Sequence, residues 1–280
     1  MNYNVLLLLL FGHLLADFPF QISYIVNMRR HDNRRKRLKG NSIHAGIHLI
    51  TYLLLLFLFN YITIQSLGFV VLLSFTHLLV DLFKSRLVIE YKLEKYNVLI
   101  FICDQLFHYF LIIVIAYFIS VRSFSFRSIF EIQKQALIFM STITFNQSLL
   151  LACCLLAAGL WGTGIFIKIF IEYLEFAPYE KIVNIGKSNI ENTAVKKYNA
   201  DVSYIIGILE RLFIICAIVF KIPSGIALAI GLKSIARFKE FDDDWFVKIF
   251  IIGSFISIIS AIVVGIIIRE LNIFPGLTVS

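Results

Sequence analysis

The sequence predicts an all-α, polytopic membrane protein of about eight spanning helices. Hydrophobic residues make up 59% of the chain and charged residues only 16%, with a mean hydropathy of +0.86. A soluble domain is about 45–50% apolar and about 25% charged. The apolar runs are close to the ~20 residues that a helix needs to cross a bilayer, and they lack the alternation of a membrane β-strand. These observations exclude a soluble globular enzyme and a disordered chain.

Hydropathy places the expected spans at residues 4–27, 42–64, 67–87, 97–119, 146–170, 204–220, 222–238 and 246–268. A piece near 127–143 has mixed polarity and is expected to lie as an interfacial helix. The stretch 172–203 is polar and is expected to be the one sizeable soluble connection. We therefore expect a four-span bundle over 1–125, a middle part with the fifth span over 126–203, and a three-span part over 204–280.

Basic residues indicate how the chain crosses the membrane. The run MRRHDNRRKRLKG, which begins at residue 28, holds seven Lys and Arg between two expected spans. With this run in the cytoplasm, 18 of the 26 basic residues fall on the cytoplasmic side and five on the opposite side. The positive-inside rule then predicts a cytoplasmic (inner) membrane protein with both termini outside. Attraction to anionic lipid headgroups is a second role for the run, and no recognition motif indicates a nucleic-acid partner.

Five of the six histidines and three aspartates occur in four pairs, all with the spacing i, i+4. The pairs are His13/Asp17, His44/His48, His77/Asp81 and Asp104/His108, one in each of the first four expected spans. Residues four apart share a helix face. Because successive spans alternate in direction, every pair falls in the cytoplasmic half of the membrane. Four helices that carry imidazoles and carboxylates at one depth predict a metal site in the core of a bundle.

A divalent metal ion would compensate for the cost of placing these groups in the membrane. One ionisable side chain at the centre of a spanning helix costs about 2.5–3.5 kcal/mol on the insertion scale. Nitrogen and oxygen ligands without thiolate favour zinc, with iron or manganese as alternatives. The eight groups suffice for two ions and an open position. A metal-free proton relay is the other explanation for the same residues.

Further polar residues are candidates for substrate binding. Gln21 lies one turn beyond the first pair, and Lys84 lies three residues after the third. Lys84 could equally be a lysine that extends its ammonium group to the membrane surface. Lys233 and Arg237 share the spacing i, i+4 near a cytoplasmic span end and could bind an acidic headgroup. The alternative is that Glu210 pairs with one of these two cations across the helices.

The segments HLLADFPFQ, HAGIH, HLLVDLFKSR and DQLFH, in this order, resemble the bacterial integral-membrane family known as domain of unknown function 3307. IGILER followed by GLKSIARF is similar to the second half of its longer members. The resemblance covers spans one to four and six to eight. It implies architecture and not function, because the activity of the family is not established. A looser likeness to membrane-bound metal-dependent hydrolases concerns residue types and their placement, and is an analogy.

The function favoured by these residues is metal-dependent hydrolysis of a membrane lipid or lipid-linked substrate. Asp17 or Asp81 would bind the metal or act as general base toward a metal-bound water. The alternatives are a metal-ion or proton transporter, a di-iron membrane oxidase, and a non-enzymatic scaffold with a structural metal. The transporter would need a polar path through the outer half of the membrane, which the sequence does not show. Neither the substrate nor the oligomeric state follows from the sequence.

Overall fold

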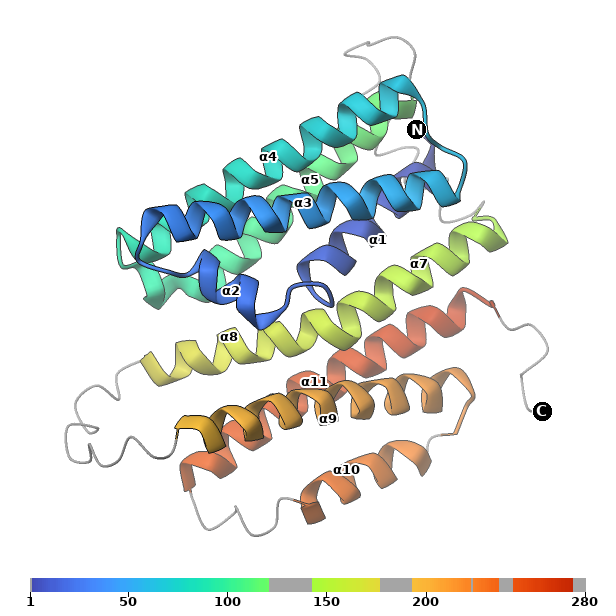
Figure 1. Ribbon diagram of the computed structural model, residues 1–280. Helices are drawn as coiled ribbons and strands as arrows, with labels where there is room; N and C mark the ends of the chain where they lie inside the picture. Colours follow the sequence, from blue (N-terminus) through green and yellow to red (C-terminus); the bar gives the residue numbers. More distant parts are fainter. Residues whose placement is uncertain (1, 121–142, 177–192, 223, 237–243, 274–280) are drawn as a thin grey trace. The chain divides into compact units, whose positions relative to one another are not determined.

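The computed structural model describes residues 2–120, 143–176, 193–222, 224–236 and 244–273 (Figure 1). Within these ranges the chain forms helices and no strand, which agrees with the predicted all-α class. The chain divides into two compact units, Met1–Ala157 and Ala158–Ser280. The predicted interfacial helix near 127–143 lies almost wholly outside the described residues.

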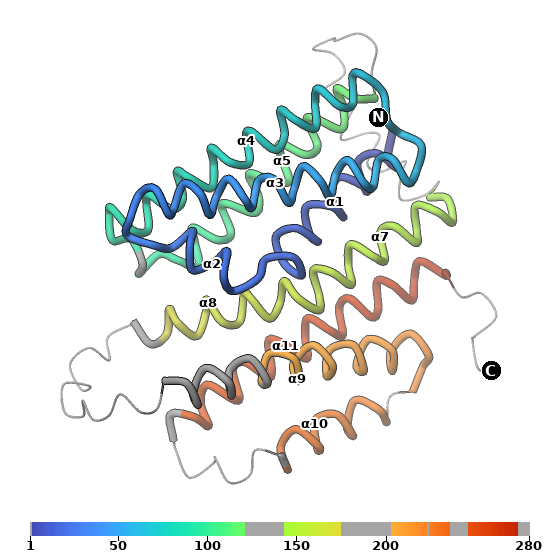
Figure 2. The backbone as a smooth tube through the Cα atoms, viewed as in Figure 1, coloured from blue at the N-terminus to red at the C-terminus, as the bar shows by residue number. Residues whose placement is uncertain are grey.

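The first unit is built around a four-helix bundle. Its elements are α1 (Tyr3–Asp17), α2 (Ser23–Arg29), α3 (Arg34–Leu58), α4 (Ile64–Ile89), the short 3-10 helix η1 (Leu93–Tyr96), α5 (Asn97–Ser120) and α7 (Phe145–Ala157). Helices α1, α3, α4 and α5 pack in a closed ring in which each contacts the next and α5 contacts α1. Helix α2 packs on α3, and α7 packs on α1. Along the backbone, α1 and α4 run in one direction and α3 and α5 in the other (Figure 2).

The first predicted span, residues 4–27, is wrong as a single helix. Helix α1 ends at Asp17, where the N–H of Phe18 makes the last helical bond. Pro19 follows, which has no N–H to continue the ladder and disfavours helical geometry in the residue before it. A turn over 18–22 then leads into α2. Because of this break, the chain turns back toward α3 before it reaches the basic run.

Helix α3 begins at Arg34, well before the residue 42 expected from hydropathy. The side chain of Asn33 accepts hydrogen bonds from the N–H groups of Arg35 and Lys36, which fixes this start. Part of the basic run therefore lies on the first turns of α3 and not in a loop. The expected spans 67–87 and 97–119 agree within a few residues with α4 and α5.

Several helices have the length and composition needed to cross a membrane. Among the described residues five stretches qualify, namely Arg34–Leu58, Ile64–Ile89, Asn97–Ser120, Phe145–Leu174 and Phe246–Glu270. Two shorter apolar helices are Tyr3–Asp17 and Ser224–Ile235. These helices are compatible with a multi-pass membrane protein and with most of the predicted spans.

A buried apolar core fills one end of the bundle. Its members include Val5, Leu8, Leu9, Tyr52, Leu56, Val70, Leu73, Ile112 and Ala116. On α1 and α4 these residues precede the His/Asp pair, whereas on α3 and α5 they follow it. Since neighbouring helices are antiparallel, all of them lie at the same end. The polar pairs therefore occupy the other half of the bundle interior.

Helix α2 lies unusually close to α3 at Gly40. A Cβ atom at Gly40 would lie 2.7 Å from the Cβ of Met28 and 2.8 Å from the backbone nitrogen of Arg29. Helix α2 cannot retain this position if residue 40 has a side chain. Gly40 thus allows α2 to bring Arg29 to the bundle interior.

Gly40→Ala is expected to destabilise the protein by about 1–3 kcal/mol, as overpacking of a tight contact does. Gly46→Ala on the same helix is the matched control, because a Cβ there meets nothing within 4 Å. That control should be neutral or gain about 0.5–1 kcal/mol from reduced backbone entropy. Thermal unfolding of the two variants in detergent compares them, and equal stability would contradict the tight packing of α2.

The second unit comprises the π-helical turn η2 (Ala158–Gly162), α8 (Thr163–Phe176), α9 (Thr193–Val219), α10 (Ser224–Ala236) and α11 (Asp244–Glu270). Helix α9 packs against α11 and α10, and α8 packs against α11. The stretch 172–203 is predicted to be a polar connection, but α8 extends into its start and α9 into its end. Residues 177–192 between them lie outside the described residues.

A buried guanidinium group joins the helices of this second unit. Arg211 of α9 is 2% exposed. Its Nε and Nη2 both donate to the backbone carbonyl of Leu160, at 3.1 and 2.6 Å, and its Nη1 donates to the Ser257 hydroxyl at 3.2 Å. Leu160 lies in η2, where the widened turn disturbs the regular ladder of helical bonds. Arg211 therefore supplies donors to the helix at its irregular turn.

Candidate metal centre

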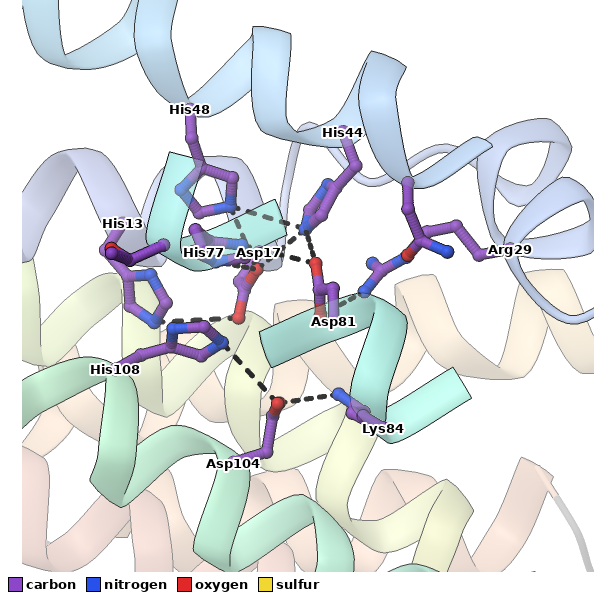
Figure 3. A network of polar contacts seen from close by, with 12 residues as sticks. His13, Asp17, Arg29, His44, His48, His77, Asp81, Lys84, Asp104 and His108 are labelled. Carbon is purple, nitrogen blue, oxygen red and sulfur yellow. Dashed lines mark hydrogen bonds and ion pairs between the residues drawn. The ribbon is translucent and has the colours of Figure 1, made fainter. Parts of the chain in front are cut away.

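The bundle brings together all eight side chains of the four predicted pairs (Figure 3). They come from α1, α3, α4 and α5, and none is more than 8% exposed. The i, i+4 spacing places both members of each pair on the face of its helix that points into the bundle. The result is a cluster of five imidazoles and three carboxylates in the interior.

Asp17 lies at the centre of this cluster. Its Oδ1 is 3.0 Å from Nε2 of His44, 3.1 Å from Nε2 of His48 and 3.6 Å from Nε2 of His77. The two Nε2 atoms of His44 and His48 are 3.3 Å apart. With bonds of about 2.0–2.1 Å, the ligands of a tetrahedral zinc ion are about 3.3–3.4 Å from one another. The three distances that join Oδ1 of Asp17 and Nε2 of His44 and His48 are close to this value. Ligand atoms within 4.8 Å of one another are also offered by two overlapping groups, His13, Asp17, His48 and His77, and His44, His77 and Asp81.

The second ring nitrogen of His77, Nδ1, faces Asp81. Its Nδ1 is 3.2 Å from Oδ2 of Asp81, and Oδ1 of Asp81 is 2.6 Å from Nη2 of Arg29. The Nε of Arg29 donates to Asn41 at 3.0 Å. A histidine that binds a metal usually directs its second ring nitrogen at a carboxylate, which fixes the tautomer and the ring. Arg29, Asp81 and His77 form such a chain, which ends beside Asp17.

Tyr52 and Gln105 contact further atoms of the cluster. Nδ1 of His48 is 3.3 Å from the hydroxyl of Tyr52. The amide of Gln105 donates to Oδ2 of Asp17 at 2.8 Å, while its oxygen is 3.4 Å from Nε2 of His13. Both oxygens of Asp17 are therefore held in place, one by Gln105 and the other by the imidazoles.

A second group lies next to the first. Asp81, Asp104 and His108 each offer a ligand atom within 4.8 Å of the others. Nζ of Lys84 donates to Oδ2 of Asp104 at 2.5 Å. The ring of His108 stacks on that of His77 at 3.9 Å and 12°. The two groups thus share one continuous interior.

Within the described part of the chain, several of these atoms make no hydrogen bond of good geometry, although some have an ion-pair contact such as that between Nδ1 of His77 and Oδ2 of Asp81. They are Nδ1 of His13, Nδ1 of His44, both ring nitrogens of His77, Oδ2 of Asp81, Oδ1 of Asp104 and Nε2 of His108. A buried polar atom without a hydrogen bond costs about 1–3 kcal/mol. Such a concentration of unsatisfied nitrogen and oxygen atoms fits a site for a divalent cation, with donors typical of zinc, iron or manganese.

Residues 5–138 match the sequence profile of a family described as "Protein of unknown function (DUF3307)". This amino-terminal part of the chain belongs to the DUF3307 family. No curated protein and no solved structure matches the chain. The DUF3307 segment contains all four pairs and the four helices that carry them. The family membership predicted from the four motifs is therefore confirmed, and it names no activity.

The predicted substrate-binding residues have different surroundings. In the DUF3307 segment, the amide of Gln21 is satisfied in the orientation in which its nitrogen donates to the backbone carbonyl of Asp17, at 3.1 Å, and its oxygen accepts from Arg29, so Gln21 lies against the turn after α1. Lys84 is 29% exposed and pairs with the buried Asp104. Lys84 is thus a positively charged residue of the cluster whose side chain is partly exposed at the protein surface.

The two predicted cations of the carboxy-terminal part lie outside the DUF3307 segment. Nζ of Lys233 is 2.7 Å from Oε2 of Glu210 in the second unit, so the alternative pairing considered from the sequence is confirmed. Arg237 lies outside the described residues. Headgroup binding by Lys233 and Arg237 stays a prediction.

Arg29 is the residue that the sequence did not identify. It is one of seven basic residues in its run, and nothing in that run distinguishes it from its neighbours. The only sequence signal is Pro19, which ends α1 and allows α2 to return toward the pairs of the DUF3307 segment. Tyr52, one turn after His48, was also missed, although its i, i+4 spacing matches that of the pairs.

Proposed function

We propose that the cluster binds one divalent metal ion, and that the protein uses this ion to hydrolyse a membrane lipid or lipid-linked substrate. The observation that carries the proposal is the convergence of three imidazole nitrogens, from His44, His48 and His77, on one carboxylate oxygen of Asp17. Zinc fits this donor set first, and iron or manganese are the alternatives.

The charges of the cluster favour a single ion. Asp17, Asp81 and Asp104 are three carboxylates, whereas Arg29 and Lys84 supply two positive charges. With neutral imidazoles the cluster has one more negative than positive charge. One divalent ion with a bound hydroxide brings the sum to zero, and a second ion would leave an excess of positive charge in a buried site, which is costly.

This balance is also suited to hydrolysis. A bound divalent ion converts water into a nucleophile near neutral pH and polarises a carbonyl or phosphoryl oxygen. In this proposal Asp17 binds the ion and Asp81 orients His77, so both predicted catalytic aspartates act through the metal. Lys84, which is partly exposed, is the group placed to attract an anionic substrate.

The apolar core at the other end of the bundle favours hydrolysis over transport. Leu8, Leu9 and Leu56 are almost completely buried there, with no ionisable member among the core residues of α1 or α4. An ion pathway through a membrane needs polar groups or water along its length. A substrate that reaches the polar end of the bundle from the membrane surface needs no such passage.

Elemental analysis of the full-length protein in detergent tests the proposal. We expect about one zinc or manganese ion per chain, and its loss in His48→Ala. His31→Ala is the matched control, because His31 is exposed and lies outside the cluster. Vesicles of a phosphorylated lipid, incubated with the loaded protein, should then release product only with the wild type and the control.

The other outcomes separate the alternatives. Iron, with an oxygen-dependent product, would indicate the oxidase. A metal ion whose removal unfolds the protein, without hydrolysis of any lipid, would indicate a structural metal in a scaffold. Wild-type protein that takes up no metal even after supplementation would contradict the proposal and leave a proton relay.

A further inference from the structure

We propose that Asp81, Asp104 and His108 form a second cation site, and that the ammonium group of Lys84 occupies the place of its metal ion. This inference rests on the proposed metal centre at Asp17. It states why the protein would bind one ion although its eight ligands suffice for two.

The ligand set of this second site is complete. Asp81 comes from α4, whereas Asp104 and His108 come from α5, and each offers an atom within 4.8 Å of the others. All three are almost fully buried, at 1%, 6% and 2% exposure. Two carboxylates and an imidazole are a donor set for zinc, iron or manganese.

The unsatisfied atoms point to the same site. Among the residues that the structure describes, Oδ2 of Asp81, Oδ1 of Asp104 and Nε2 of His108 make no hydrogen bond of good geometry. Their contacts are ion pairs, at 3.2 Å between Oδ2 of Asp81 and Nδ1 of His77 and at 3.5 Å between the atoms of Asp104 and His108. Each residue of the group therefore has one ligand atom that no hydrogen bond satisfies. Three such atoms in one group exceed what ordinary packing leaves, because buried polar atoms are nearly always hydrogen-bonded.

Lys84 already supplies the positive charge. It lies three residues after Asp81 on α4 and therefore on the same face of the helix. Its Nζ is 2.5 Å from Oδ2 of Asp104, and its side chain is 29% exposed. A lysine ammonium is a compact point charge at the end of a flexible stem. The ammonium group neutralises the charge of Asp104. A second metal ion at this site would lie close to the ammonium group, and the two positive charges would repel each other.

Arg29 does not compete for this role. Its donors are directed at Asp81 and Asn41, and Gln21 also faces it. A guanidinium held by several partners is part of the framework, whereas Lys84 reaches the cluster from its rim. The charge of Lys84 is therefore the one that a metal ion can replace.

The experiment counts zinc ions bound to the full-length protein in detergent, by equilibrium dialysis against zinc alone followed by elemental analysis. We expect one ion for the wild type and two for Lys84→Met. Lys84→Arg retains a positive charge and should bind one. Lys84→Met combined with Asp104→Asn removes both the cation and a ligand, and should also bind one.

The outcomes separate this inference from the proposed function. One ion in both the wild type and Lys84→Met would overturn the inference and leave the metal centre at Asp17 intact. Two ions in the wild type would also overturn it. No ion in the wild type would overturn the proposed function and the inference together. If Lys84→Met fails to fold with zinc in the growth medium while the double variant folds, zinc has not replaced the lost charge, and the inference is wrong.

Discussion

Asp17→Asn is expected to weaken metal binding by more than about a hundredfold and to abolish lipid hydrolysis. Loss of a residue that only orients a metal ligand costs about 10–100-fold in affinity. Asp17 contributes more, because its Oδ1 is the atom on which the nitrogens of His44 and His48 converge. Asparagine has the same size but no charge, so the ion would lose its only anionic ligand in this group.

A competition titration against a chelator in detergent measures this affinity. Asp32→Asn is the matched control, since Asp32 is an exposed carboxylate outside the cluster. It should bind the ion as the wild type does. Asp17→Asn with wild-type affinity would show that the metal, if bound, is held elsewhere.

Arg211→Met is expected to destabilise the second unit by about 1–3 kcal/mol, the cost of a buried polar group left without its partner. The carbonyl of Leu160 receives two hydrogen bonds from Arg211 and lies in η2. Methionine fills much of the volume of the arginine stem but donates no hydrogen bond. The irregular turn therefore loses the donors that compensate for its disturbed ladder.

Lys233→Met is the matched control for this variant. Lys233 also pairs within the second unit, but it and Glu210 are partly exposed. Loss of such a pair costs about 0–1 kcal/mol. Thermal unfolding in detergent, with limited proteolysis to locate the change in the second unit, compares the two variants. Equal losses of stability would contradict the role of Arg211 as a support for η2.

The positions of the eight cluster residues could be predicted because they depend on local periodicity. A helix places residues i and i+4 on one face whatever its neighbours are. Alternating spans then bring such faces to one depth. The same reasoning could not show that Asp17 is the centre, because this depends on how far each ring reaches across the bundle.

Features that depend on tertiary contacts were not predicted. The position of Arg29 depends on the turn after Pro19 and on the close approach of α2 to Gly40. No sequence pattern connects these two positions, because they act together only in the folded protein. The apolar run that contains η2 does not indicate a π-helical turn, and the donors to the carbonyl of Leu160 come from Arg211 on another helix. The sequence could not decide whether Lys84 faces the cluster or the membrane surface. The two alternatives differ only in where its flexible side chain places the ammonium group.

The apolar end of the bundle gives the proposed centre an electrical property. Leu8, Leu9 and Leu56 insulate it, since charge crosses such a layer only at great cost. In the proposed function, an ion that enters from the polar end would leave by the same end, and its occupancy would follow the free metal concentration of one compartment alone. A membrane that the bundle crosses would then retain its potential despite the eight ionisable side chains of the cluster.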